Sequence, residues 1–357
     1  MIYYVYPRWK NVSFSVISRQ HIAHLKGKVS VQEIDEDVLD QQMWIKPRNI
    51  ILHPILYSIM GDKPEMEEFR GKRLTKLLRV KGRLGGFETA DSDRISQKGV
   101  DICNKFDLIL VPSRYAVESY KRSGVTTPVE IVPHGLTDEM LTNDKRIYDP
   151  NLAALERMKK ERGAIFVLYF LLHSEYRKGA DIVAETMEFV QSRNSEVYLV
   201  LKGGQGEAIF NRLKGLKMLH IPQWLDDGQL RQLYDLCDVL IVPSRGGGFE
   251  LNALEGIARG LPTLVPSDGC FLDYIDYCIP VPITGKPKVL VNNPIHIGVG
   301  WETNGDFLAH AIEITVANLD HWKEKADFWS RAVCEDYSWG KVCDNLFNLL
   351  QRYDFLR

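Results

Sequence analysis

The chain has 357 residues, a length for which about two domains of roughly 150 residues each are expected. Lys plus Arg (45) nearly balances Asp plus Glu (47), and the net charge of -2 argues against a dedicated nucleic-acid-binding protein, which usually has a clear basic excess. The sequence contains neither a signal-peptide pattern nor an apolar run of the ~18 residues that span a membrane, and its six scattered cysteines indicate reduced thiols rather than a zinc site, so we expect a cytoplasmic protein.

Short β-branched runs bounded by Gly, Pro or Asp alternate with segments of helical periodicity. The predicted strands cover residues 2–6, 50–52, 108–111, 130–132, 165–169, 197–201, 219–221, 239–242 and 263–265. The predicted helices cover residues 114–123, 180–192, 227–236, 251–259 and 338–353. This alternation predicts an α/β fold with parallel sheets covered on both faces, in which ligands bind at the carboxyl ends of the strands.

The alternation of strands and helices starts a second time after a polar segment that carries Gly, Asp, Asn and Pro and no strand signal. We therefore predict a first domain over residues 1–137 and a linker region over 138–162. A second domain is predicted over 163–336, followed by an amphipathic terminal helix over 337–357.

Residues 243–262 read PSRGGGFELNALEGIARGLP and follow a buried strand. Three consecutive glycines, at 246–248, allow the backbone to approach a ligand closely. A helix is predicted from about Leu251, and the N–H groups and positive dipole at its start favour an anion such as a diphosphate. Glu255 lies one turn into this helix, where its carboxylate could accept both hydroxyls of a ribose. The segment therefore favours a nucleotide site over the alternative of a tight turn without a ligand.

This segment resembles the motif P-S-x-x-E-G-F-G-x-x-x-x-E-A-x-A-x-G-x-P of the retaining GT-B glycosyltransferases of family 4. The matching residues are Pro243, Ser244, Gly248, Phe249, Glu255, Ala258, Gly260 and Pro262. The resemblance implies two Rossmann-like β/α/β domains that face a central cleft, with a C-terminal helix that crosses back to the first domain. It also implies that Glu255 binds the nucleotide ribose and that the donor is lined by Gly247, Gly248, Phe249, Leu251 and Asn252.

The chain departs from this motif at the sugar end of the predicted donor site. The first glutamate of the family motif, which contacts the donor sugar, falls on Gly247, and the glycine after the phenylalanine is replaced by Glu250. Two interpretations follow. Either Glu250 supplies the displaced carboxylate from nearby, or the sugar is held in a different way.

A second match surrounds Lys178, in the sequence RKGAD, where the family has K-G-x-D with the lysine on the donor diphosphate. The resemblance implies that Lys178 stabilises the leaving group with support from Arg177, and the alternative is a solvated helix start. The family's second phosphate-binding cation, an arginine, has no counterpart here, and His173 or Lys202 could replace it. Lys202 opens a glycine turn that matches the family's turn beside the diphosphate.

Three further positions match the family near the donor or the acceptor. Trp224 and Leu225 precede a helix where family members hold the nucleobase, and packing is the alternative for the indole. In the first half, Glu88 stands where the family often has a histidine near the reacting sugar, so its carboxylate could position the acceptor hydroxyl. A helix-capping cluster is the alternative for Glu88. In the first loop, the N–H group of Ser13 could face the donor.

A cluster of basic residues lies within fourteen positions of the first half: Arg70, Lys72, Arg73, Lys76, Arg79, Lys81 and Arg83. A basic amphipathic helix can lie on an anionic membrane surface, which would place the protein at the inner face of a membrane. The alternative interpretations are a solvated helix and contact with an acceptor phosphate.

The residues and the resemblance together predict a retaining, metal-independent hexosyltransferase that moves a sugar from a UDP- or GDP-sugar to a hydroxyl of a sugar, lipid or protein-glycan acceptor. Glu88, Glu250 and Lys178 are the predicted catalytic residues. No D-x-D pair ends a predicted strand, so no metal is expected, and no cofactor is needed besides the nucleotide-sugar substrate. The alternatives are a non-catalytic or degenerate sugar-nucleotide-binding protein of the same fold and a sugar-nucleotide 2-epimerase.

Overall fold

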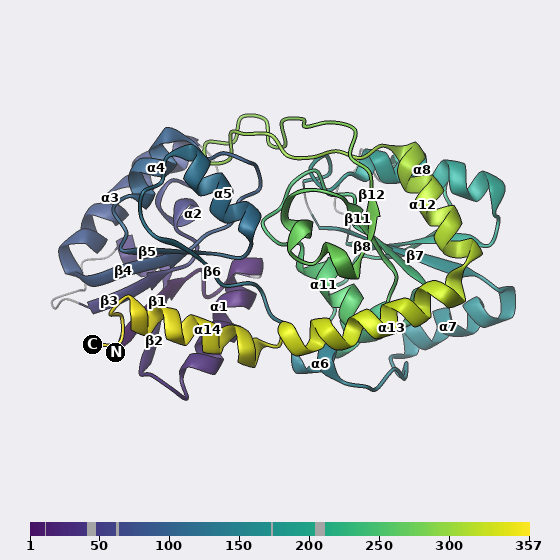
Figure 1. Cartoon of the computed structure of the whole chain (residues 1–357), viewed down its shortest axis with the longest axis horizontal. Coiled ribbons are helices and arrows are strands. Elements are labelled where there is room, and N and C mark those ends of the chain that lie inside the picture. The colour runs from purple at the N-terminus through teal and green to yellow at the C-terminus, as the bar shows by residue number, and fades with distance from the viewer. Residues whose placement is uncertain (11, 41–47, 62–63, 173, 204–210) are drawn as a thin grey trace.

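The computed structural model describes residues 1–10, 12–40, 48–61, 64–172, 174–203 and 211–357. It contains two six-stranded sheets, one in each half of the chain. Figure 1 shows the two halves side by side, each with helices on both faces of its sheet. The strand pairs of both sheets are parallel. This is the α/β architecture that the alternation of strands and helices predicts.

The first sheet has the strand order β2-β1-β3-β4-β5-β6 and the second the order β12-β11-β10-β7-β8-β9. The strands of the first sheet are β1 (Ile2–Tyr6), β2 (Val31–Asp35), β3 (Arg48–Leu52), β4 (Lys81–Phe87), β5 (Leu108–Val111) and β6 (Val129–Ile131). Those of the second sheet are β7 (Ile165–Leu171), β8 (Val197–Gly203), β9 (Met218–Ile221), β10 (Val239–Ile241), β11 (Thr263–Pro266) and β12 (Ile279–Val281). The strand order reverses between β1 and β3 and between β7 and β10, which is where open parallel sheets bind ligands.

Helices of the first half are α1 (Ser13–Leu25), α2 (Leu56–Ile59), α3 (Pro64–Val80), α4 (Gln97–Cys103) and α5 (Arg114–Ser123), with a 3-10 turn η1 (Glu36–Asp40). The later helices are α6 (Asp138–Leu141), α7 (Pro150–Arg162), α8 (Ala180–Arg193), α10 (Asp227–Leu236), α11 (Leu251–Ala258), α12 (Gly305–Ala317), α13 (Leu319–Asp336) and α14 (Trp339–Arg352), with 3-10 turns η2 (Gly269–Asp273) and η3 (Ile275–Tyr277). Capping residues in the sequence set the ends of several helices. The hydroxyl of Ser113 caps the start of α5, and Gly124 ends α5 in a left-handed conformation.

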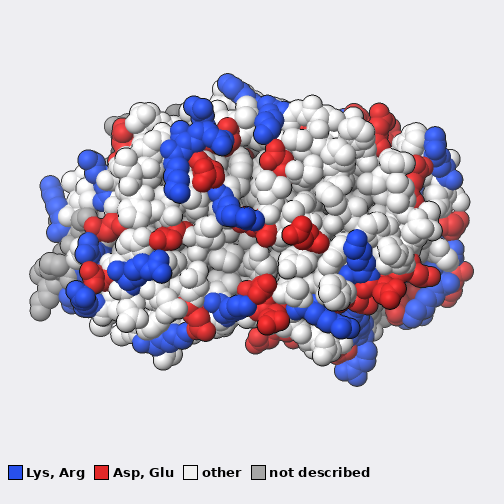
Figure 2. Space-filling view, viewed as in Figure 1, with Lys and Arg blue, Asp and Glu red and all other residues white. Residues whose placement is uncertain are grey.

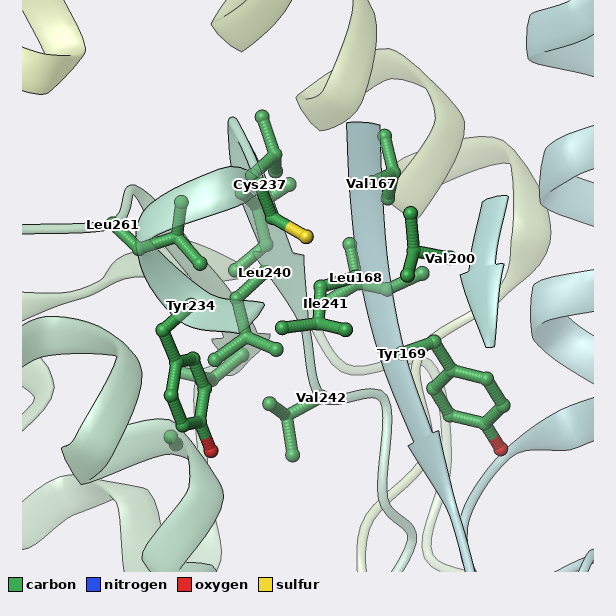
Figure 3. Packing of buried hydrophobic residues seen from close by; sticks show 14 of the residues in the cluster. Val167, Leu168, Tyr169, Val200, Tyr234, Cys237, Leu240, Ile241, Val242 and Leu261 are labelled. Atoms are coloured by element: carbon green, nitrogen blue, oxygen red, sulfur yellow. The ribbon is translucent and has the colours of Figure 1, made fainter. Parts of the chain in front are cut away.

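The second sheet is buried between two layers of helices. β10 is buried along its whole length, and so is all of β7 except Ile165 and Phe170, which are half-buried. Figure 3 shows how side chains of β7, β8 and β10 meet each other and Tyr234 of α10. Continuous apolar strands are expected where a parallel sheet is covered on both faces. Because β7 and β10 are embedded in this core, the loops that follow them start from fixed points.

The last two helices run along both halves of the molecule. α13 contacts α11 of the second half, whereas α14 packs beside α1 of the first half. The apolar face of α14, including Trp339 and Leu346, joins Ile2 and Tyr4 in one buried cluster. Figure 1 shows the yellow helices passing from one half to the other. The crossing of the C-terminal helix to the first sheet, which the resemblance implies, is thereby confirmed.

The sequence patterns predict neither β2, β4 nor β12. β4 has the sequence KGRLGGF, which is poor in strand-forming residues. It forms because it lies between β3 and β5, where close packing needs glycine. A Cβ at Gly85 would lie 2.7 Å from the ring of Phe355, and one at Gly86 would lie 2.6 Å from the carbonyl oxygen of Leu52.

The basic cluster of residues 70–83 does not form one exposed helix face. α3 ends at Val80, so Arg83 lies on β4, where it pairs with Asp107 at 3.6 Å. Arg73 is buried and donates to the carbonyl oxygen of Ser58 at 2.9 Å. Figure 2 shows positive and negative side chains interspersed on the visible face. Within the described ranges, no helix has the length and apolar character needed to cross a bilayer. Peripheral membrane contact stays a prediction.

The stretch predicted as a linker, residues 138–162, contains α6 and α7. Leu152 of α7 packs into the core of the second half. Arg259 donates from Nη1 to the carbonyl oxygens of Met140 and Thr142, at 3.1 and 2.5 Å, and so ties this stretch to the end of α11. The domain boundaries stay a prediction.

Candidate donor and transfer site

The turn between β10 and α11, residues 243–250, is buried throughout. Gly246 and Gly248 of this turn face the first half of the chain. A Cβ at Gly248 would collide with the side chain of Thr89, and one at Gly246 with the carbonyl oxygen of Asp91. The hydroxyl of Tyr274 donates to the carbonyl oxygen of Phe249 at 2.6 Å. The glycines therefore let this turn pack directly against the loop that follows β4, so that the two halves meet here.

Glu250 and Lys178 form an ion pair at the start of α11. Lys178 Nζ donates to both carboxylate oxygens of Glu250, at 2.7 and 2.6 Å, and the Glu250 side chain is 2% exposed. Glu250 has φ 57° and ψ 66°, a left-handed conformation that is uncommon for residues other than glycine. A Cβ at Gly247 would collide with the Glu250 carboxylate. The carboxylate of Glu250 therefore occupies the space that a side chain at position 247 would enter.

Arg177 reaches from the loop after β7 to both halves. Its Nη1 donates to the carbonyl oxygen of Gly246 at 3.0 Å and lies 3.4 Å from a carboxylate oxygen of Asp91. Burial opposes the charge of Arg177, but the charges of Asp91 and Glu250 outweigh it and raise its pKa. Its Nε is buried without a hydrogen-bond partner among the described residues. Arg177 is therefore held in the charged form with one N–H group unsatisfied.

Glu88 follows β4 and is buried on the side of the first half that faces the glycine turn. Its oxygens accept the N–H groups of Leu56, at 2.5 Å, and of Thr89, at 3.0 Å. Burial nevertheless raises the pKa of Glu88 to about 8, and the nearby charge of Asp91 adds to this shift. At neutral pH the carboxyl group is therefore mostly protonated and can donate a hydrogen bond.

Glu255, on α11, points toward α10. The hydroxyl of Tyr234 donates to Glu255 Oε2 at 2.8 Å, and burial raises the pKa of Glu255 to about 7. Lys202, at the end of β8, is buried and donates to the carbonyl oxygen of Gln223 at 2.9 Å. This bond fixes the turn that carries Trp224, whose side chain is 67% exposed. A half-buried carboxylate and an exposed indole therefore lie on the two segments where the family is expected to hold ribose and base.

Residues 165–276 match the family model Glycosyl transferases group 1. The chain is 30% identical to Uncharacterized protein 356 of Sulfolobus islandicus rod-shaped virus 1, over 99% of this chain and 98% of that protein. It is 29% identical to Putative glycosyltransferase 45 of the Sulfolobus islandicus filamentous virus from Hveragerdi in Iceland, over 69% of this chain and 67% of that protein. The chain belongs to the same family as the rod-shaped-virus protein.

The fold agrees with these matches. The structure of Alr3699/HepE from Anabaena in complex with UDP and glucose superposes with a TM-score of 0.66 at 11% identity, over 98% of this chain and 99% of that one. The chain is a GT-B glycosyltransferase. The prediction of a GT-B fold and of a transferase is thus confirmed.

Other predicted donor residues of the glycosyltransferase lie at or beside the starts of α1, α10 and α11. Leu251 and Asn252 are the first residues of α11, which no side chain of the described residues caps. Leu225 is buried beside the start of α10. Ser13 is exposed at the start of α1, after β1, and within the described ranges no hydrogen bond ties its side chain to the second half. His173 lies outside the described residues.

Several residues of the site are not identified by the sequence patterns. Asp91 appears in the sequence only as part of a helix-capping cluster, yet it faces Arg177 across the two halves. Tyr234 has the spacing of a core residue on a helix. His296 stands in a segment without strand or helix periodicity. Within the part of the chain that the structure describes, no group of three His, Cys, Asp or Glu side chains is arranged to hold a metal ion.

Proposed function

We propose that this glycosyltransferase moves a hexose from a UDP- or GDP-sugar to an acceptor hydroxyl, without a metal ion and with retention of the anomeric configuration. The observation that carries the proposal is the Lys178–Glu250 ion pair, which joins the loop after β7 to the end of the glycine turn. It lies where β7 and β10 adjoin, which is the switch point of the second sheet. Retention and metal independence come from the motif resemblance.

The leaving diphosphate is assigned to Lys178 and the start of α11. The Lys178 side chain is 21% exposed, and Glu250 holds its ammonium group in place. The first N–H groups of α11 and the helix dipole add positive potential next to it. Preorganised donors of this kind stabilise the charge that develops on a leaving group.

The donor sugar is assigned to the carboxylate of Glu250, which would accept hydrogen bonds from sugar hydroxyls. Its location beside Gly247 supports this assignment, because the family motif places a glutamate at position 247. The left-handed backbone of Glu250 also fits a functional role, since a strained residue of this kind costs on the order of 1 kcal/mol and is concentrated at active sites.

The acceptor hydroxyl is assigned to a position next to the carboxyl group of Glu88. Because the pKa of Glu88 is about 8, its carboxyl group is a poor proton acceptor at neutral pH and a good hydrogen-bond donor. A front-face mechanism, in which an oxygen of the leaving group takes the acceptor proton, needs no ionised protein base. Glu88 would then orient the reacting groups instead of removing the proton.

The nucleoside is assigned to Glu255 and the turn with Trp224 and Leu225. The free oxygen of an ionised Glu255 would accept ribose hydroxyls, while Tyr234 holds the other oxygen at 2.8 Å. The Anabaena protein was solved with UDP, which makes UDP-sugars the first donors to test here.

The experiment is an exchange of two residues. Glu250→Gly removes the carboxylate but suits the left-handed backbone, so the variant should stay folded and lose about 100-fold in transfer or donor hydrolysis. The double variant Gly247→Glu with Glu250→Gly restores the family motif. We expect its activity to be about tenfold higher than that of Glu250→Gly. The measurement is the turnover of a panel of UDP- and GDP-sugars by wild type and both variants, with the melting temperature as the folding control. Wild-type turnover in Glu250→Gly would show that Glu250 does not contact the sugar.

A further inference from the structure

Residues 285–301, which we call the strap, belong to the second half but pair with the first half. Figure 1 shows this light green loop at the top of the view, running from the second half toward the first. The N–H of Ser96 donates to the carbonyl oxygen of Ile295 at 2.8 Å, and the N–H of Ile297 donates to that of Arg94 at 3.1 Å. The side chain of Ile295 is fully buried in the core of the first half. The strap is therefore a fixed part of the junction between the halves.

The strap places His296 inside this junction. The residue is 0% exposed, and neither ring nitrogen has a hydrogen-bond partner among the described residues. Its ring lies 5.9 Å from that of Tyr57, centroid to centroid. A buried imidazole without any partner carries a free-energy cost that native proteins rarely retain without a reason. Packing alone would be served better by an apolar side chain.

The groups around His296 are those of the transfer site. Burial lowers its pKa, the charge of Asp91 opposes this, and the charge of Arg177 adds to it, so the imidazole is neutral and both charged groups are near. Arg177 also has a buried Nε without a partner among the described residues. Asp91 in turn influences the pKa of Glu88. Two polar groups of the second half without hydrogen-bond partners among the described residues, the His296 ring and Arg177 Nε, thus lie near the predicted acceptor side.

We propose that His296 binds a hydroxyl group of an uncharged glycan acceptor and so helps to select neutral acceptors over phosphorylated ones, an inference that rests on the proposed function. A neutral imidazole offers one donor and one acceptor, and a hydroxyl group can satisfy either. An oxyanion cannot donate, so it can pair only with the ring N–H, whereas a hydroxyl group can also donate to the other ring nitrogen.

The charges nearby favour the same class of acceptor. Arg177 faces Asp91, and Lys178 is paired with Glu250, so each cation of this region is matched by a carboxylate. Glu88 adds a hydrogen-bond donor, not a charge, at neutral pH. A phosphate on the acceptor would meet no excess of positive charge here, whereas sugar hydroxyls would find both donors and acceptors.

The test measures acceptor binding without relying on turnover. Wild type, His296→Leu and His296→Asn are loaded with UDP or GDP and titrated with methyl glucoside, methyl mannoside, methyl galactoside, glucose and glucose 6-phosphate, with ligand-observed NMR as the readout. We expect at least one neutral sugar to bind wild type, to bind His296→Leu about tenfold more weakly, and to regain part of its affinity in His296→Asn. Glucose 6-phosphate should bind no more tightly than glucose.

Two controls separate this role from a structural one. His310→Leu, at an exposed histidine on α12, should leave sugar binding unchanged. The melting temperature of His296→Leu should equal or exceed that of wild type, because leucine removes an unsatisfied polar group.

The proposal is overturned by equal sugar binding in wild type and His296→Leu, by tighter binding of glucose 6-phosphate, or by a large drop in melting temperature with unchanged sugar affinity. Absence of any sugar binding to wild type also overturns it, because no sugar hydroxyl would then pair with His296. If wild type binds neither UDP nor GDP, the proposed function fails, and the sugar titrations without nucleotide still decide the role of His296.

Discussion

The proposed donor side in the second half and the proposed acceptor side in the first half are built in different ways. On the donor side, the glycine turn follows β10, the cations follow β7, and both strands are embedded in one apolar core. On the acceptor side, Glu88 follows β4, its partner Leu56 begins a short helix, and His296 arrives on the strap from the other half. One side depends on a continuous segment of sequence, whereas the other depends on contacts between distant segments.

The charge states differ in the same way. The donor side holds an ionised pair, Lys178 and Glu250, in direct contact. The acceptor side holds groups that burial keeps neutral, Glu88 with a pKa of about 8 and His296 with a lowered pKa. An ionised side suits a diphosphate that departs with its charge, and a neutral side suits a hydroxyl group that has to be oriented. The comparison predicts that charge-removing substitutions will act on different steps in the two halves.

The largest effect is expected from Lys178→Met, which keeps the length of the side chain and removes its charge. Loss of a preorganised cation at the leaving group should lower kcat about 100-fold or more, or about 3 kcal/mol in transition-state stabilisation. It also leaves the buried Glu250 carboxylate without its partner. Steady-state kinetics with a donor that wild type turns over measures the change in kcat. Lys214→Met, outside the site, is the control. A change in KM alone would mean that Lys178 binds ground state and transition state equally.

On the acceptor side, Glu88→Gln should alter the pH dependence of stability. The pKa of Glu88 is raised in the folded state, from an ordinary value of 4.5 to about 8, so the folded chain holds a proton that the unfolded chain has released. Stability contributed by this proton is present at low pH and is lost as pH rises toward 8. Between about pH 6.5 and 8, wild type should lose about 1.5 kcal/mol relative to Glu88→Gln, because each pKa unit corresponds to 1.36 kcal/mol.

Urea unfolding of both proteins at the two pH values measures this difference. Parallel curves for wild type and Glu88→Gln would mean that Glu88 is already ionised in the folded chain. The acceptor side would then resemble the donor side in charge, and the contrast between the halves would be lost.

A smaller effect is expected at the ribose end of the donor side. Burial raises the pKa of Glu255 to about 7, and only the ionised carboxylate accepts both ribose hydroxyls. UDP affinity should therefore rise as pH increases through 7, by about tenfold between pH 6 and 8. In Glu255→Gln the affinity should be low at both pH values and nearly independent of pH. Calorimetric titration with UDP at pH 6 and pH 8 measures both affinities. An equal pH dependence in Glu255→Gln would mean that the titrating group is a residue other than Glu255.

The two sides were not equally predictable from sequence. Gly247, Gly248, Glu255 and Lys178 lie in two short motifs whose meaning is local, so the sequence places them on the correct turn and helix starts. β4 could not be predicted, because its glycines are needed for contacts with Phe355 and Leu52 that only the folded chain contains.

His296 was equally hidden from sequence. Nothing near it has a period of 2 or 3.6 residues, and its location depends on backbone pairing with residues 94–96 of the other half. Asp91 faces Arg177 for the same reason, through a contact that spans the two halves. The sequence therefore predicts the local structure around the proposed donor end better than the contacts around the proposed acceptor end.

The smallest effect sharpens the assignment of Glu255. Tyr234→Phe removes one hydroxyl that donates to Glu255 at 2.8 Å, and this hydrogen bond lowers the pKa of the carboxyl group against the effect of burial. Without it the pKa should rise further, so at neutral pH a smaller fraction of Glu255 would be ionised. We expect UDP affinity near pH 7 to fall about threefold, or about 0.7 kcal/mol, and the midpoint of the pH dependence to move upward. At high pH the affinity should return most of the way to the wild-type value, because the carboxylate is then ionised in both proteins. A loss of affinity that is the same at every pH would instead mean that the Tyr234 hydroxyl contacts the nucleotide directly or positions Asn252, whose carbonyl oxygen it also approaches at 3.3 Å.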